Sequence, residues 1–160
     1  MPAFDLIELF FFAYRDFVGD ADRLLASLQF GRAHHRVVHF VNRNPGLTIA
    51  ELLDILQITK QSLNRVLKEL LEKGYVESRA GQNDRRQRLL YPTMAGQKLA
   101  LELALMQSER FDRALALLPG RAREDAVEFL LAMVDPGERD KVSALIWNKG
   151  KLSAGSGDKD

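Results

Sequence analysis

The feature that most constrains this chain is a change of hydrophobic period at Gly74. Before it, "KQSLNRVLKELLEK" (60–73) repeats apolar residues at helical spacing, and a glycine in this position commonly ends a helix. After it, "YVESRA" (75–80) alternates, "GQND" (81–84) makes a turn, and "RLLY" (88–91) can return as a partner strand. The chain must therefore place a β-hairpin directly after a helix.

Two short helices are expected ahead of that hairpin. Thr48 and Glu51 form a capping box at the start of "TIAELLDIL" (48–56), in which hydroxyl and carboxylate each satisfy a free backbone N–H. "LQI" (56–58) is a short turn, and Thr59 can cap the helix that follows. Two short helices joined by a tight turn are the helix-turn-helix arrangement, whose second helix can enter the DNA major groove. A hairpin placed directly after them makes a wing.

Helical periodicity dominates the N-terminal third as well. A first helix is expected over Phe4 to Val18, bent or broken by "GDAD" (19–22). A second is expected from about Arg32 to Arg43, because Asn44-Pro45-Gly46 is strong turn punctuation.

The C-terminal part is also expected to be helical. Thr93 caps a long helix from Met94 to Leu118, and shorter helices follow at 123–134 and 138–148. The predicted fold class is therefore mainly α with a small β-wing. The expected organisation is an N-terminal dimerisation helix (1–30), a winged helix-turn-helix lobe (31–93), C-terminal dimerisation helices (94–147) and a flexible tail (148–160).

Positive charge is concentrated in the segment with this predicted lobe. The chain has 23 Lys and Arg against 22 Asp and Glu, for a formal net charge of +1. Residues 58–92 hold eight basic and four acidic side chains, a net charge of +4, which leaves −3 for the remainder. A nearly neutral chain with its positive charge in one segment has what phosphate binding requires.

The helix over 60–73 has a core face and a polar face. Its apolar stripe, which must face the core, consists of Leu63, Val66, Leu67, Leu70 and Leu71. The polar residues are of the types that bond base edges, and they lie mostly in the first half of the helix, the part that a recognition helix inserts most deeply. We take the candidate DNA contacts here to be Thr59, Lys60, Gln61, Ser62, Asn64, Arg65 and Lys68. The alternative is an ordinary solvated helix face.

The predicted wing carries four arginines. Arginine at a hairpin tip can enter the minor groove, where narrow A·T-rich tracts concentrate negative potential. Asp84 opposes DNA binding by its charge, so its expected role is to hold a neighbouring guanidinium by a charge-assisted bond. The candidate contacts in the wing are Arg79, Asp84, Arg85, Arg86 and Arg88. The alternative is a solubilising loop, but three arginines in four residues exceed what solubility requires.

The run from Pro45 to Gly96 resembles the winged helix-turn-helix of MarR-type bacterial transcriptional regulators. The resemblance lies in "LTIAEL", in the Thr-Lys opening of the second helix, in Arg65 followed by apolar spacing to "EKGYV", in the wing "DRR" and in "T-x-x-G" (93–96). It implies a homodimer with intertwined terminal helices, acting on palindromic double-stranded DNA, expected as a repressor. Asp84 and Arg86 match the wing Asp-x-Arg of the family, which implies Arg86 as the minor-groove finger. Pro92 departs from the pattern, and the return strand is expected to end early there.

Aromatic and aliphatic residues at the N-terminus favour a dimer independently of any family. The helix over 4–18 carries Phe4, Leu6, Ile7, Phe10, Phe11, Phe12, Tyr14 and Phe17, which surround most of its circumference. The long helix carries Leu99, Leu101, Leu103, Leu105 and Met106 in the same manner. A helix that is apolar all round must be covered on several sides, and a second subunit supplies that cover. The alternative is that residues 121–147 fold back over both helices.

The three histidines lie together at positions 34, 35 and 39. His35 and His39 share the face opposite Val37 and Val41, and a pair at this spacing can bind metal if a third ligand is added. We identify no such ligand in the sequence. Metal-responsive regulation through His35 and His39 is one interpretation, and a surface-polar or pH-titrating pair is another. The family resemblance adds a third, in which His35 and His39 line a pocket for a small acidic or aromatic effector.

Other function classes find little support. No cysteine is present, which removes disulfides and thiolate metal sites within the chain. The longest uncharged run is nine residues, too short for a membrane span. The motifs of P-loop enzymes, α/β-hydrolases, zinc proteases and dinucleotide-binding enzymes are absent from the sequence, so no enzyme activity and no cofactor are expected. The expected location is the cytoplasm. The remaining alternative is a winged-helix module that binds protein, which should lack arginines at the wing tip.

Overall fold

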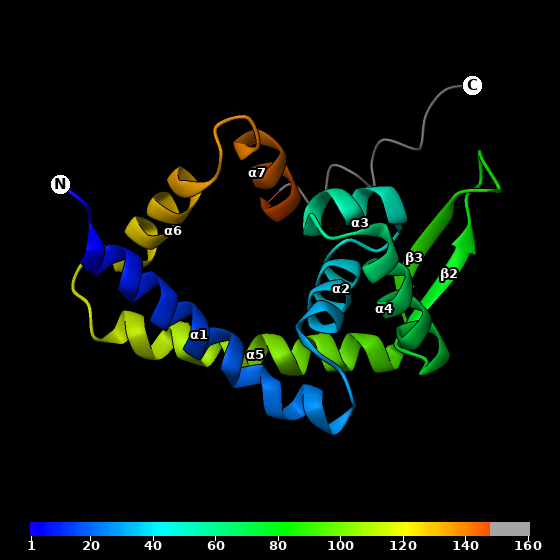
Figure 1. The fold of residues 1–160 in the computed structure, drawn as a ribbon, viewed down its shortest axis with the longest axis horizontal. Coiled ribbons are helices and arrows are strands. Elements are labelled where there is room, and N and C mark those ends of the chain that lie inside the picture. Colours follow the sequence, from blue (N-terminus) through cyan, green and yellow to red (C-terminus); the bar gives the residue numbers. More distant parts are fainter. Residues whose placement is uncertain (148–160) are drawn as a thin grey trace. The chain divides into compact units, whose positions relative to one another are not determined.

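The computed structural model describes residues 1–147 and shows a mainly helical chain with one small antiparallel sheet. The predicted flexible tail (148–160) lies outside the described residues. The chain forms two compact units, Met1–Phe111 and a second that begins at Asp112, and each is described by itself. The elements, shown in Figure 1, are α1 (Phe4–Ser27), α2 (Arg32–Arg43), β1 (Leu47–Thr48), α3 (Ile49–Leu56), α4 (Lys60–Glu72), β2 (Val76–Ala80), β3 (Arg88–Pro92), α5 (Met94–Ala116), α6 (Ala122–Met133) and α7 (Arg139–Trp147).

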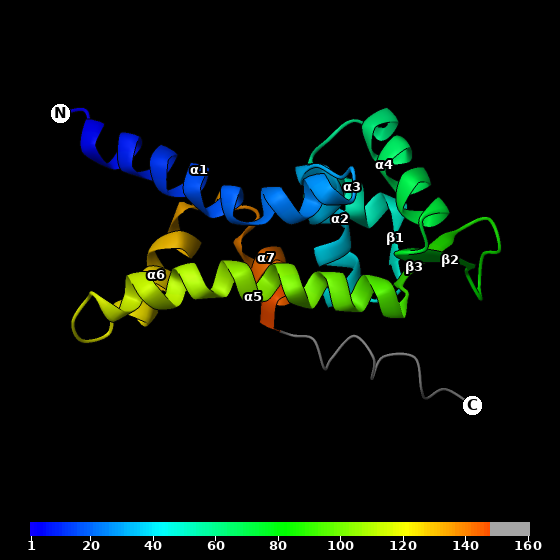
Figure 2. The same ribbon diagram turned by 90° about the horizontal axis from the view of Figure 1, so that it is seen from below.

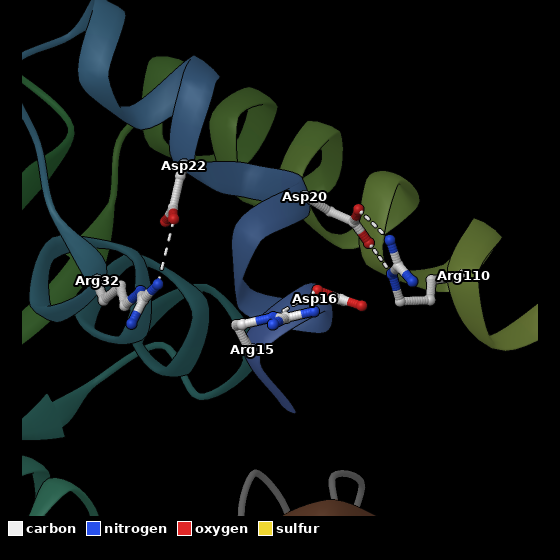
Figure 3. A network of polar contacts seen from close by, with 6 residues as sticks. All are labelled: Arg15, Asp16, Asp20, Asp22, Arg32 and Arg110. Atoms are coloured by element: carbon white, nitrogen blue, oxygen red, sulfur yellow. Dashed lines mark hydrogen bonds and ion pairs between the residues drawn. The ribbon is translucent and has the colours of Figure 1, made fainter. Parts of the chain in front are cut away.

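Helix α1 continues past the point where the sequence predicts a break. The prediction allowed a break or a bend at "GDAD", and the break is wrong, because α1 runs unbroken from Phe4 to Ser27. Glycine inside a helix costs about 1 kcal/mol relative to alanine, which tertiary contacts outweigh here. Ala21 and Leu25 are buried, and Asp20 forms a bidentate ion pair with Arg110 of α5 at 2.5 and 2.9 Å (Figure 3).

The helix-turn-helix consists of α3 and α4, and threonines cap both helices as predicted. The Thr48 hydroxyl accepts the backbone N–H of Glu51 at 3.1 Å and donates to the Glu51 carboxylate, also at 3.1 Å. The Thr59 hydroxyl accepts the backbone N–H of Ser62 at 3.1 Å. Between them, Gln57 adopts a left-handed conformation that ends α3. The two helices are therefore separated by three residues.

The hairpin predicted after α4 is present, and it belongs to a three-stranded sheet in the order β1-β3-β2. Strand β1 contains only two residues and was not predicted, since so short a strand has no alternating pattern to detect. The expectation that the return strand ends early at Pro92 is wrong, because β3 extends through Pro92, which pairs with Val76. The neighbouring bond from the Thr93 N–H to the Tyr75 carbonyl (3.2 Å) makes that pair a non-hydrogen-bonded one, so proline loses no ladder bond there.

The start of α5 is fastened to the end of α4. Gly74 ends α4 with φ +78, and the Thr93 hydroxyl donates to its carbonyl at 2.6 Å. The same hydroxyl accepts the backbone N–H of Gly96 at 3.0 Å and so caps α5. A Cβ on Gly96 would lie 2.0 Å from the Tyr75 carbonyl oxygen. The predicted "T-x-x-G" motif is therefore a joint that requires both a capping hydroxyl and a residue without a side chain.

The core of the first unit lies between α2, α3, α4, the sheet and α5. Its fully buried residues include Val37, Val41, Leu52, Leu63, Val66, Leu70, Leu90 and Leu103. One residue of the predicted α4 stripe does not belong to it, because Leu71 is 39% exposed. In Figure 2 the hairpin of β2 and β3 extends away from the helices of this unit.

The second unit contains α6, α7 and the end of α5, and the structure shows no buried residue in α6 or α7. The Arg139 guanidinium donates to the carbonyls of Val134 and Ala132 at 3.0 and 2.7 Å, which satisfies the C-terminal end of α6. The long helix predicted to Leu118 ends at Ala116. Over residues 1–147, no helix is long and apolar enough to cross a membrane.

The joint at Gly96 predicts the effect of a single methyl group. Gly96→Ala should lower the free energy of unfolding by about 1–3 kcal/mol, because the new Cβ meets a backbone carbonyl that cannot rotate away. The matched control is Gly19→Ala in α1, where the added Cβ meets nothing within 4 Å. That variant should gain about 0.5–1 kcal/mol from helix propensity. Denaturant unfolding of both variants checks the prediction, and equal effects of the same sign would contradict it.

Candidate nucleic-acid interface

Helix α4 presents a polar arc on the side opposite its buried residues. Leu63, Val66, Leu67 and Leu70 are buried, which commits one side of the helix to the core. Its exposed polar residues span about 140° of the remaining circumference at 100° per residue. These are Lys60, Gln61, Asn64, Arg65, Lys68 and, at the end of the helix, Glu72.

The hydroxyls of Thr59 and Ser62 are engaged in the helix cap. Thr59 is exposed and Ser62 is half-buried, and the Thr59 hydroxyl donates to the Ser62 hydroxyl at 2.9 Å. Thr59 also accepts the Ser62 backbone N–H. These two candidate contacts therefore fix the start of α4, and the residues that follow them carry the polar arc.

The wing tip is closed by backbone bonds around Asp84. The Asp84 carboxylate accepts the backbone N–H of Arg86 at 3.0 Å, so the expectation that it holds a neighbouring guanidinium is wrong in this detail. The Asp84 carbonyl accepts the N–H of Gln87 at 3.1 Å, and the Gln87 carbonyl accepts that of Gly81 at 2.8 Å. A Cβ on Gly81 would lie 2.6 Å from the Asp84 carbonyl oxygen. Asp84 thus orients Arg86 through the main chain and leaves its guanidinium available.

The four arginines of the wing fall into two kinds. Arg79 forms an ion pair with Glu77, and its guanidinium lies 4.1 Å from the centre of the Tyr91 ring. Within residues 1–147, the guanidinium groups of the other three form no hydrogen bond or ion pair. These three, Arg85, Arg86 and Arg88, are exposed at the tip and on the return strand. Arg79 is therefore held at the base of the wing, and the other three remain to meet phosphates or base edges.

The structure brings two of the helix candidates and one of the wing candidates to a common hollow. Asn64 and Lys68 of α4 line a hollow of about 520 Å³ that Arg88 of β3 also lines. Ser78 and the exposed Leu71 line it too, and neither was predicted as part of the site. Arg85 and Arg86 lie in the turn between β2 and β3, at the tip of the hairpin. The sequence contains no periodic signal for Ser78. It joins this hollow through its pairing with Leu90 of β3, which only the register of the sheet reveals.

His34 is a buried polar residue to which sequence reasoning assigned no role. It is 7% exposed, and both ring nitrogens are bonded. Nδ1 accepts the Gly31 backbone N–H at 3.0 Å, and Nε2 lies 2.6 Å from Glu69 Oε2 of α4. The available signal was its position three residues after Gly31, the glycine that directly precedes α2, where a side-chain acceptor can bond the free backbone N–H at the helix start.

His35 and His39 lie together in a second hollow of about 250 Å³, as their shared face predicted. Its lining comes from three helices of the first unit: Tyr14, Phe17 and Val18 of α1, Arg32, Arg36 and Phe40 of α2, and Gln107 of α5. The Arg36 guanidinium donates to the Tyr14 hydroxyl at 2.8 Å, and Arg32 pairs with Asp22 at 3.2 Å (Figure 3). The hollow is thus bordered by aromatic rings and by cations.

Burial lowers the pKa of His35, the charges of His39 and Arg36 lower it further, and Asp22 acts in the opposite direction. His35 is therefore held in its neutral form at neutral pH. A metal site would need a third ligand beside His35 and His39. In the described part of the chain no cluster of three histidine or carboxylate ligands occurs.

Comparisons with a family model and with a curated relative point to the same family. A family model described as "MarR family" matches residues 28–87. The HTH-type transcriptional regulator PetP of Rhodobacter capsulatus is 47% identical over 133 residues, which cover 83% of this chain and 80% of that protein.

Solved structures agree in fold. The crystal structure of S. aureus MepR in its DNA-binding conformation has a TM-score of 0.69 at 19% identity, covering 81% of this chain and 96% of that one. The S. aureus MepR–DNA complex has a TM-score of 0.62 at 20% identity, covering 79% and 94%. The polar arc of α4, the arginine wing and these likenesses agree, and the chain belongs to the MarR family of helix-turn-helix transcriptional regulators, which are not enzymes.

Proposed function

We propose that this chain acts as a homodimer that binds a pseudo-palindromic DNA site, with α4 in the major groove and the wing of β2 and β3 at the minor groove. The observation that carries the proposal is the hollow that Asn64 and Lys68 of the α4 arc share with Arg88 of the wing, next to a hairpin tip that exposes Arg85 and Arg86. Arginine and lysine bond guanine, and asparagine and glutamine bond adenine, so the arc has the chemistry of direct readout. We propose repression as its mode of action, in the cytoplasm.

The charge distribution supports a nucleic-acid partner over a protein partner. The segment 58–92 carries a net charge of +4 in a chain of net charge +1, and its cations face outward. A winged helix that binds protein has no need of three exposed arginines within four residues. Moreover, a solved structure of similar fold, MepR, is a complex with DNA. Affinity should then fall steeply with salt, since phosphate neutralisation releases counterions.

The exposed apolar surface of α1 supports the homodimer. Its N-terminal half exposes large side chains at 44–66% of their surface, namely Phe4, Leu6, Ile7, Leu9, Phe10, Phe11, Phe12 and Tyr14. Soluble monomers rarely expose so continuous an apolar surface, which marks an interface. Phe129, Leu130 and Met133 of α6 are exposed in the same way. We propose that α1 and the C-terminal helices (94–147) form the dimer interface and that 31–93 forms the DNA-binding lobe.

The experiment that tests this function is selection of binding sites from random DNA, followed by sedimentation of the complex on the selected site. The expected result is a two-fold symmetric sequence with half-sites about one helical turn apart, bound by two chains. Failure to enrich any sequence, with weak binding only, would contradict the proposal and favour the protein-binding alternative.

Arg86 should contribute a minor-groove contact. Arg86→Ala should weaken binding to the selected site by about 1–3 kcal/mol, with the fold unchanged, because its guanidinium is free of protein partners and its backbone is held by Asp84. Gel-shift titration measures the loss. The control is Arg123→Ala on α6, which removes the same charge outside the lobe. Equal losses for both variants would rule out the finger role.

Gln61→Ala and Asn64→Ala test base recognition by α4, whereas Arg86→Ala tests the wing. Both residues are exposed on the polar arc of α4 and carry no charge. Their substitution should relax sequence preference more than it lowers affinity for random DNA. An equal loss on random DNA would show that they contact only the backbone.

We also propose that the hollow at His35 and His39 binds a small acidic or aromatic effector. Aromatic side chains and the cations Arg32 and Arg36 surround it, which suits an aromatic carboxylate. The hollow lies between α1 of the proposed dimer interface and α2 of the DNA-binding lobe, so an occupant would contact both. Metal-responsive regulation remains the alternative, and it would require a ligand from outside the described residues.

His35 gives a pH-dependent signature of this hollow. Its pKa in the folded chain lies below 6.5, the ordinary value for histidine, so at pH values just below 6.5 the unfolded chain binds more protons than the folded chain does. The free energy of unfolding should therefore fall as the pH drops through that interval, and His35→Asn should reduce this dependence. Identical pH profiles for wild type and His35→Asn, measured by denaturant unfolding, would contradict the assignment of this pH dependence to His35.

The effector proposal has its own test. Benzoate should stabilise the wild type against unfolding more than neutral benzamide does.

A further inference from the structure

The proton on the His34 ring can be assigned from its neighbours. A backbone N–H only donates, so Nδ1, which accepts from Gly31, carries no proton. The neutral ring then carries its proton on Nε2 and donates it to the Glu69 carboxylate, 2.6 Å away. That hydrogen bond lowers the pKa of Glu69, desolvation opposes it, and the charges of Arg65 and Lys73 act in the same direction as the bond. Glu69 is thus held as an ionised acceptor on α4.

A second bond joins α4 to the same segment. Lys73, one turn beyond Glu69, donates from Nζ to the Leu28 carbonyl at 2.8 Å. Its ammonium lies 4.8 Å from the centre of the Phe30 ring, and Phe30 in turn stacks on His34 at 4.6 Å. Helix α4 is therefore fastened at two successive turns to residues 28–34, which comprise the connection between α1 and α2 and the first turn of α2.

That connection is itself rigid. Gln29 ends α1 in a left-handed conformation with φ 59, and the Phe30 N–H bonds the Leu25 carbonyl at 2.8 Å. The Gln29 N–H bonds the Ala26 carbonyl at 3.0 Å, which completes a Schellman motif. A bond from α4 to this segment consequently fixes α4 relative to α1 and α2.

The spacing on α4 relates this attachment to DNA reading. Gln61, Arg65 and Glu69 recur every four residues, so they lie along one side of the helix with a shift of about 40° per step. The apolar stripe sets how far α4 lies from the core, but apolar contacts are not directional. The hydrogen bonds at Glu69 and Lys73 are directional, and they limit rotation of α4 about its own axis.

From this geometry we propose that His34 is a positioning residue for base recognition. By donating to Glu69 it holds the rotation of α4 at which Gln61, Asn64 and Arg65 meet base edges. Bidentate base contacts require that orientation, whereas phosphate contacts by long cationic side chains tolerate its loss. This role rests on the proposed DNA-binding function. Removal of the hydrogen bond from His34 to Glu69 should lower discrimination between the selected site and random DNA by about tenfold, which corresponds to the loss of one good base contact.

The test uses substitutions that separate the two bonds of His34. In His34→Gln the side-chain amide N–H takes the place of Nε2 and keeps the bond to Glu69. In His34→Asn the amide oxygen takes the place of Nδ1 and keeps only the bond to Gly31. The measurement is the ratio of dissociation constants for the selected site and for random DNA, with the salt dependence of binding and the free energy of unfolding recorded for each variant.

The expected result is that His34→Gln discriminates within about twofold of the wild type, that His34→Asn loses about tenfold, and that both keep the salt dependence of the wild type. If both variants discriminate as the wild type does and differ only in stability, His34 is merely structural and the proposal is overturned. A wild type that selects no DNA sequence would overturn the proposed function, and the positioning role with it.

Substitutions at Glu69, the hydrogen-bond partner of His34, keep the test decisive if a His34 variant does not fold. Glu69 lies at the surface with its side chain 36% exposed, so its truncation leaves the core intact. Glu69→Gln retains an acceptor for His34 and should preserve discrimination, and Glu69→Ala should lose it. The matched control is Glu102→Ala, which removes the same charge from an exposed position of α5, outside the hollow that α4 and the wing share. Equal discrimination by Glu69→Ala and Glu102→Ala would overturn the proposal.

Discussion

The packing of one side of α4 is the constraint on which the rest of this structure depends. Four successive core residues, Leu63, Val66, Leu67 and Leu70, bury that side completely or almost so. Because one side of α4 is committed to the core, the opposite side is left exposed to solvent. The capping hydroxyls, the hairpin and the buried histidine each then act on a helix whose exposed side is already determined.

The backbone of the wing is fixed at both of its ends. The joint at Thr93 and Gly96 holds the base of the hairpin against α5, and main-chain bonds around Asp84 close its tip. Rigidity at both ends lets long, flexible arginine side chains project from a defined backbone. The lobe therefore combines a directional surface on α4 with an electrostatic one on the wing, the two components that sequence-specific DNA binding requires.

Local chemistry in the sequence was enough to predict much of this. The caps at Thr48 and Thr59, the stop at Gly74 and the hairpin all depend on neighbours within a few residues, and all are present. The errors share another cause. The continuity of α1 at Gly19 depends on contacts such as the ion pair between its neighbour Asp20 and Arg110 of α5. The His34–Glu69 bond joins residues 35 apart in sequence, which no periodicity can reveal.

The order of strands has a consequence for the handling of this protein. In the order β1-β3-β2, one edge of the sheet is a strand of two residues and the other is β2. Open strand edges pair with other chains and promote aggregation unless they are short or charged. Here β2 carries Glu77 and Arg79, whose charges guard this edge of the sheet against self-association. The ion pair at the base of the wing thus also protects the chain from edge-to-edge aggregation.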